Sequence, residues 1–128
     1  PAFPHLADAR YGLAFALQNQ NKTDEAVKLY QQVADASSGI SGAKSRFMLG
    51  EIAFAEKDYD DAVFQFGAVV SGYGFEHWQG LAQFEMARCL NAAGKQPQAI
   101  AALEKMLNDF SDHERAEDAQ RLLAELQK

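Results

Sequence analysis

Small residues recur along this chain at a nearly constant spacing, and that spacing limits what the chain can fold into. Two series each repeat after 36 and then 37 positions: Ala14, Gly50 and Ala87, and Ala26, Ala62 and Ala99. A fixed period of this size is typical of a solenoid, in which one unit of supersecondary structure stacks on the next. The sequence therefore predicts an array of similar units.

The segment Phe47–Val70 is predicted to form the central unit, two antiparallel helices folded onto each other. Gly50 lies midway along the first helix and Ala62 lies near the start of the second, so the two backbones can approach closely. Asp58 is predicted to cap the second helix, because its carboxylate can accept a hydrogen bond from a free N–H group of the first turn.

Apolar residues at helical spacing predict seven helices, and no segment alternates with period two for long enough to form a strand. We expect an all-α fold, a right-handed superhelix formed by one domain over residues 1–128. Its expected parts are three helical hairpins and a C-terminal capping helix: about 4–38, 42–74, 77–110 and 112–126. Pro4 suits the first turn of the first helix. Ser111 and Glu114 predict a capping box at the start of the last helix.

The two ends of the array differ. The last predicted helix has a single apolar stripe: Ala116, Ala119, Leu122, Leu123 and Leu126. Such a helix can pack on one side and face water on the other. The first helix carries apolar residues, among them Leu6, Leu13 and Phe15, around more of its circumference. We expect this face to be covered, either by preceding units of a longer chain or by a second copy of the protein. In the second case the protein would be a homo-oligomer.

Length and composition exclude several classes of protein. A chain of 128 residues suits one domain, and its one cysteine allows no internal disulfide. The net charge of -6 argues against nucleic acid, whose phosphates call for clustered Lys and Arg. Apolar runs are only a few residues long, so no membrane span is expected. The chain opens with Pro1, without a signal peptide, which indicates a processed chain or part of a longer one.

These units resemble the tetratricopeptide repeat, which has a period of about 34 residues. The first helix of each unit carries the expected bulky and small pair: Leu13-Ala14, Leu49-Gly50 and Met86-Ala87. The second helix carries a large apolar residue four positions after its alanine: Tyr30, Phe66 and Leu103. The family's usual turn proline is absent, and Arg10, Arg46 and Gln83 stand where the family often has Trp. The extra residues per period are expected to lengthen the turns between units.

The repeat ends also resemble those of bacterial cell-envelope proteins, such as the periplasmic Tol-Pal-associated factor and an outer-membrane assembly lipoprotein. Tyr73 and Phe110 take the aromatic place of that pattern, although the proline that usually follows is missing. This resemblance implies a periplasmic or cell-envelope location rather than a cytoplasmic one.

Few residues offer catalytic or metal-binding chemistry. His5, His77 and His113 lie near predicted helix starts about one unit apart, so we expect roughly 10 Å between them, too far to share a metal ion. Cys89 has no base near it in a helical register and is expected to be a buried structural thiol. We therefore expect no enzyme, no metal site and no cofactor.

The resemblance implies a partner-binding groove lined by the first helix of each unit. The corresponding positions are Asp8, Tyr11, Phe15, Gln18, Lys44, Phe47, Glu51, Phe54, Leu81, Phe84, Arg88 and Asn91. Three rings in this set, Tyr11, Phe47 and Phe84, form a row with one ring per unit. They are either buried between units or partly exposed in the groove. The cationic clamp with which some family members bind C-terminal carboxylates is absent, since Phe15, Phe47 and Glu51 occupy its positions.

Two functions follow from the resemblance. The first is a non-catalytic scaffold that binds a segment of a protein or peptide in the groove. The alternative is an assembly or spacer module of a larger repeat protein, with no ligand of its own.

Overall fold

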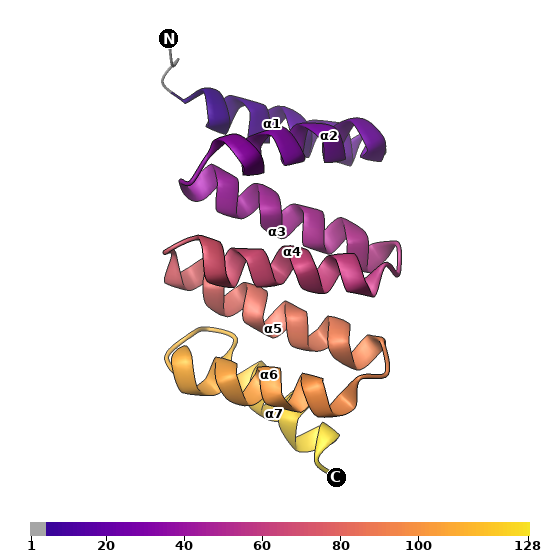
Figure 1. Cartoon of the computed structure of the whole chain (residues 1–128), viewed down its shortest axis with the longest axis vertical. Helices are drawn as coiled ribbons and strands as arrows, with labels where there is room; N and C mark the ends of the chain where they lie inside the picture. Colours follow the sequence, from indigo (N-terminus) through magenta and orange to yellow (C-terminus); the bar gives the residue numbers. More distant parts are fainter. Residues whose placement is uncertain (1–4) are drawn as a thin grey trace.

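The computed structural model describes residues 5–128, which form seven α-helices and no strand (Figure 1). The helices are α1 (Leu6–Asn19), α2 (Thr23–Ala36), α3 (Ile40–Ala55), α4 (Tyr59–Gly72), α5 (Glu76–Ala92), α6 (Gln96–Asp109) and α7 (Ala116–Leu126). Each helix packs mainly against its neighbours in the chain, so the helices stack in sequence order from α1 at one end to α7 at the other. The predicted all-α solenoid is confirmed, while the predicted helix start at Pro4 lies outside the described residues.

The core consists of three clusters, each shared by three consecutive helices. At the centre of each lies the large side chain of the second helix of a hairpin: Tyr30, Phe66 and Leu103, all fully buried. The small residue of the first helix packs in the same layer, because only a short side chain leaves room for the large one. At Gly50 the fit is tight, because a Cβ atom there would lie only 2.7 Å from Cε1 of Phe66.

The turn within each hairpin has the same geometry in all three hairpins. One residue adopts a left-handed backbone conformation in each: Asn21 (φ 63°), Lys57 (φ 63°) and Gly94 (φ 78°). The next residue donates its N–H to a carbonyl five positions back, which closes a Schellman motif. Asp58 then caps α4 by accepting a hydrogen bond from the Asp61 N–H at 3.2 Å, as predicted.

The turns between hairpins are shorter than expected. Residues 37–39 and 73–75 form the first two, and the extra residues of the period lengthen α3 and α5 to 16 and 17 residues instead. Gly42 explains part of this difference. A Cβ atom there would overlap with the Ser37 carbonyl, so only glycine lets the first turn of α3 close against the turn before it.

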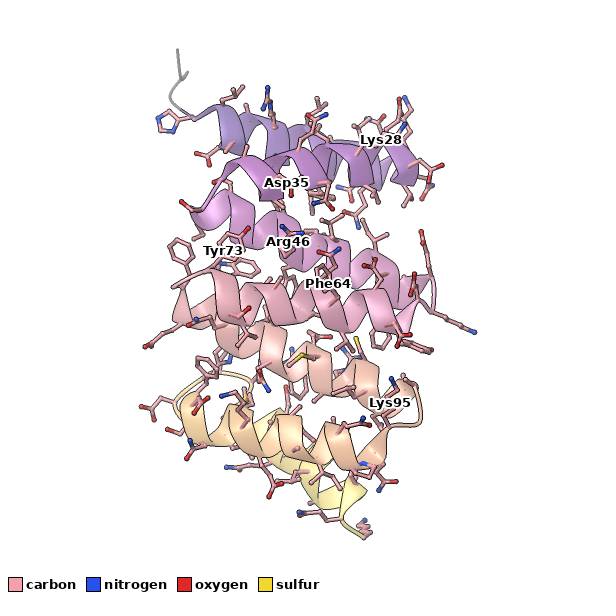
Figure 2. All side chains as sticks on the ribbon, in the orientation of Figure 1. Lys28, Asp35, Arg46, Phe64, Tyr73 and Lys95 are labelled. Atoms are coloured by element: carbon pink, nitrogen blue, oxygen red, sulfur yellow. The ribbon has the colours of Figure 1, made fainter. Side chains whose placement is uncertain are left out.

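Arg46, which stands where the family often has Trp, links three helices on the side where α2, α4 and α6 lie (Figure 2). Its Nη2 lies 3.6 Å from Oδ1 of Asp35 on α2, and its Nη1 donates to Oε1 of Gln65 on α4 at 3.2 Å. A charged residue therefore fills the position by pairing across the helices.

Helix α7 begins at Ala116, four residues later than predicted, and the capping box is wrong. Arg115 is the N-cap and makes no side-chain capping bond. Glu114 instead reaches Nδ1 of His77, 3.3 Å away. The turn between α6 and α7 folds back onto the start of α5. Because residues 111–115 are held in this turn, α7 begins only at Ala116. No helix within residues 5–128 is long and apolar enough to span a bilayer.

Candidate functional site

The predicted groove residues lie on α1, α3 and α5, the first helices of the three hairpins, which also touch one another. Five of these side chains are exposed: Asp8, Phe15, Glu51, Arg88 and Asn91. Five more are partly exposed: Tyr11, Gln18, Lys44, Phe54 and Leu81. We call these ten residues the groove surface.

The remaining two predicted residues are not accessible. Phe47 and Phe84 are each only 4% exposed. The Phe47 ring lies against Phe66 and Trp78, with centroid distances of 5.1 and 5.4 Å. The Arg115 guanidinium covers Phe84, 4.7 Å from the ring centroid. Both rings therefore belong to the core, because side chains from other elements cover them. We exclude them from the candidate binding surface.

Polar contacts join α1 to α3 at one end of the groove surface. Nζ of Lys44 lies 4.4 Å from the centroid of the half-buried Tyr11 ring. The Ser41 hydroxyl donates a hydrogen bond to Asp8, and this bond, followed by one from His5, lowers the pKa of the Asp8 carboxyl. Asp8 and Lys44 thus take part in holding neighbouring hairpins together while they still reach solvent.

A cavity of about 260 Å³ lies between α3 and α5. Its lining residues are Glu51, Phe54, Ala55, Phe66, Glu85 and Arg88. Nη1 of Arg88 donates to Oε2 of Glu85 at 2.7 Å, and its guanidinium carbon lies 5.5 Å from the Phe54 ring centroid. Sequence reasoning missed Glu85, although its position three residues before Arg88 on one helix is a recognisable pairing signal.

Burial by neighbouring side chains raises the pKa of the Glu51 carboxyl. The charge of Glu85 raises it further, and Arg88 opposes the shift. The ionised form of Glu51 is therefore less favourable in the folded protein than in water, although part of its side chain reaches solvent.

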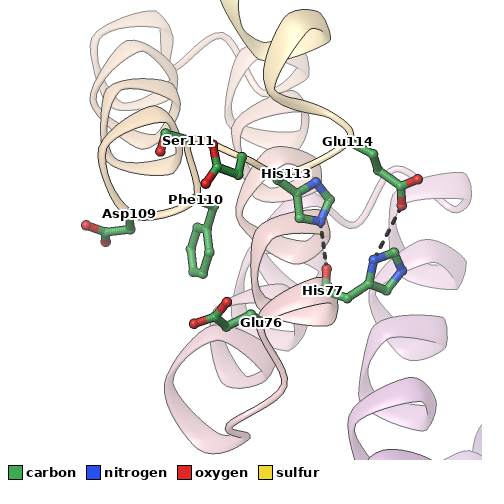
Figure 3. A pocket seen from close by; sticks show the side chains of 8 residues that line it. Glu76, His77, Asp109, Phe110, Ser111, His113 and Glu114 are labelled. Atoms are coloured by element: carbon green, nitrogen blue, oxygen red, sulfur yellow. Dashed lines mark hydrogen bonds and ion pairs between the residues drawn. The ribbon is translucent and has the colours of Figure 1, made fainter.

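A second cavity, of about 480 Å³, lies where the α6–α7 turn meets the start of α5 (Figure 3). His77 and His113 stack there with ring centroids 5.5 Å apart. The expected separation of roughly 10 Å is therefore wrong for this pair. His113 does not lie at the start of a helix but in a turn that folds back, and its ring packs where Gly80 has no Cβ atom.

The two histidines and Glu114 place ligand atoms within 4.8 Å of one another, a spacing that a metal ion could draw together. Hydrogen bonds already use both ring nitrogens of His113. Nε2 donates to the His77 carbonyl at 2.8 Å, and Nδ1 accepts from the Arg115 N–H at 3.0 Å. A metal would have to displace one of these bonds, so the cluster is better explained as a structural link between α5 and the α6–α7 turn.

Cys89 is fully buried on α5, and burial raises the pKa of its thiol to about 12. A thiol that stays protonated at neutral pH is a poor nucleophile and a poor metal ligand. This agrees with its expected structural role.

Stacked helical hairpins whose first helices share one accessible side define a helical repeat protein. Models of the tetratricopeptide repeat match residues 11–70 and 81–113, well over half of the chain together. The chain belongs to the tetratricopeptide repeat family. No curated protein shows a significant match to the sequence.

Solved structures agree on the fold. The chain is similar to a crystal structure of nearly identical TPR-like repeats from a putative kinesin light chain of Podosopora anserina, with a TM-score of 0.74 and 24% identity. The match covers 97% of this chain and 66% of that one. A crystal structure of a single-substitution variant of the same repeats gives a TM-score of 0.68 at 24% identity, over 98% of this chain and 68% of that one.

Proposed function

We propose that this chain is a non-catalytic scaffold whose groove surface binds an extended or helical segment of a partner protein. Tetratricopeptide repeats generally mediate protein–protein interaction. The observation that carries the proposal is the run of accessible side chains across all three hairpins, one helix from each.

The chemistry of the groove surface supports this role. The rings of Tyr11, Phe15 and Phe54 are accessible beside the charged groups of Lys44 and Arg88. Aromatic and arginine side chains dominate the energetics of protein interfaces, because they bury a large area and still form polar contacts. The surface therefore suits a peptide segment better than a small molecule.

Charge reversal at Lys44 and Arg88 tests the proposal. Each side chain reaches solvent, so Lys44→Glu and Arg88→Glu should leave the fold intact. Each should lower the unfolding free energy by about 1–2 kcal/mol, because the first loses the contact with the Tyr11 ring and the second loses the ion pair with Glu85. Binding to a fluorescently labelled decapeptide library should change in both variants, while circular dichroism shows unchanged helicity. Lys28→Glu on the exposed side of α2 (Figure 2) is the matched control and should bind as the parent does. Loss of helicity would make Lys44 and Arg88 structural, and equal binding by all three variants would refute the groove assignment.

A second candidate function, assembly into a larger array, is favoured by the exposed face of α1. Leu13 is 55% exposed, whereas Leu49, its equivalent one hairpin later, is 5% exposed and packs in the cluster that contains Tyr30 of α2. The face of α1 that carries Leu13 therefore corresponds to a face that is buried between hairpins elsewhere in the array. We propose that a further helical hairpin or a second copy of the chain covers it.

We also propose a cell-envelope location, which rests on the resemblance of the repeat ends. In the structure the Tyr73 hydroxyl donates to the Ala34 carbonyl at 3.1 Å, so the aromatic residue of that pattern joins α2 to the α4–α5 turn. Fractionation of the source cells with an antibody against the protein tests the location, and recovery in the cytosol alone would refute it.

A further inference from the structure

Glu51 lies near the middle of the groove surface. Its position corresponds to Phe15 in the first hairpin and Arg88 in the third, at separations of 36 and 37 residues. Among residues 5–128 its carboxylate has neither an ion pair nor a side-chain hydrogen bond, whereas neighbouring charged groups have both. It is therefore a charged group on the groove surface without a direct partner of its own.

The surroundings of Glu51 contain more negative than positive charge. Arg88 is the nearby cation, and it already pairs with Glu85 on its own helix at 2.7 Å. Two carboxylates therefore share one guanidinium. Because burial and Glu85 disfavour the ionised form of Glu51, a second cation placed beside it would be stabilised more than at an ordinary exposed glutamate.

The cavity beside Glu51 has the size of a side-chain subsite. Its volume of about 260 Å³ is below the range of roughly 300–1,000 Å³ that is usual for small-molecule pockets. Phe54, Ala55 and Phe66 form its apolar lining, and Glu51, Glu85 and Arg88 form its charged lining, in which the two carboxylates outnumber the one guanidinium. Long cationic side chains place an aliphatic stem against apolar surface and a charged head against a carboxylate, which matches this lining.

We propose that this cavity is a subsite for one arginine or lysine side chain of the bound segment, with Glu51 as its counter-ion. The inference rests on the proposed function, because it specifies one chemical feature of the segment that the groove surface binds. The charged head group of the bound arginine or lysine contacts the Glu51 carboxylate, and the aliphatic part of that side chain lies along Phe54.

A positional-scanning decapeptide library, in which each position in turn is fixed as one amino acid, tests the subsite. The parent protein should select Arg or Lys at one position. Glu51→Gln should lose this selection, because it removes the charge and keeps the shape. Glu104→Gln, an exposed glutamate on α6, should retain it.

The best arginine peptide is then compared with the same peptide carrying citrulline, which has the shape of arginine without its charge. The parent should bind the arginine peptide roughly five- to tenfold more tightly, and Glu51→Gln should bind both equally. Peptide binding that Lys44→Glu and Arg88→Glu change, but that shows no preference for Arg or Lys, would overturn the subsite and leave the proposed function intact. A preference that survives Glu51→Gln would also overturn it. Absence of any peptide binding at the groove surface would overturn both.

Discussion

Gly50 shows how a single hydrogen atom in place of a side chain sets the spacing between two helices. Alanine is normally the better helix former, by about 1 kcal/mol. At Gly50, however, an added Cβ atom would meet the Phe66 ring at 2.7 Å. We expect Gly50→Ala to lower the unfolding free energy by about 1–3 kcal/mol, as overpacking in a core does, and Gly50→Leu to lower it more.

Gly12 provides the matched control for this prediction. It also lies within a helix, α1, but no atom would lie within 4 Å of a Cβ atom there. Gly12→Ala should therefore raise the unfolding free energy by up to about 1 kcal/mol. Urea denaturation of both variants measures the difference, and two changes of the same sign would contradict the close contact between α3 and α4.

Glu51 makes stability depend on pH in the direction opposite to a salt-bridged carboxylate. Its pKa is raised above 4.5 in the folded state, so folding favours the protonated form. The unfolding free energy therefore falls as pH rises through the interval from about 4.5 to the higher folded-state pKa. We expect Glu51→Gln to raise the melting temperature at pH 7 and to have a smaller effect below pH 4.5. Melting curves of the parent, Glu51→Gln and Glu104→Gln at pH 7 and below pH 4.5 test this prediction. If Glu51→Gln raised the melting temperature equally at the two pH values, the raised pKa of Glu51 would be contradicted.

At the scale of the element, one turn within a hairpin holds a residue with a side chain in a backbone conformation that favours glycine. Gly94 adopts φ 78° without strain, but Lys57 adopts φ 63° at the equivalent position. A left-handed conformation costs a residue with a side chain roughly 1 kcal/mol. Lys57→Gly should therefore stabilise the protein by up to about 1 kcal/mol in chemical denaturation. Lys22→Gly, at a position where φ is -90°, should give no such gain, and a loss at Lys57 would show that this turn is held by its side chain.

The elements also show what a sequence can and cannot predict. The hairpins can be predicted from the spacing of small and large residues, because the large Phe66 ring fits only where a residue as small as Gly50 lies opposite it. The start of α7 does not follow, because a capping box at Ser111 is worth only about 1 kcal/mol. The docking of His113 on α5, through a hydrogen bond to the His77 carbonyl and ring packing at Gly80, outweighs it.

The same limit applies to the groove surface. The period of the sequence predicts that the candidate residues of α1, α3 and α5 share one side of the array. Whether a ring on that side is accessible depends on residues from other elements. Trp78 covers Phe47, and Arg115 covers Phe84 from a turn whose path the sequence alone does not show.

At the scale of the whole molecule, the uncovered face of α1 predicts self-association or the docking of another hairpin. If copies associate through this face, Leu13→Glu should shift the sedimentation coefficient to that of a monomer, because it places a charge in the contact. Phe64→Glu is the matched control, since Phe64 is 64% exposed on α4 (Figure 2) and lies outside α1. A parent that sediments as a monomer and whose α1 amides exchange slowly with solvent would show that α1 needs no cover.

The other end of the array has the opposite character. The side of α7 that faces away from α6 is exposed and largely polar, and Arg121 there lies 3.4 Å from Asp118 and 4.0 Å from Glu117. Head-to-tail joining of α1 to α7 would have to strip water from these charges, whereas joining of α1 to α1 would not. Copies that meet through α1 would therefore form a closed pair, with the polar side of each α7 facing away from the contact. This difference between the ends of the array disfavours an open filament, in which α1 of one copy would pack on α7 of the next.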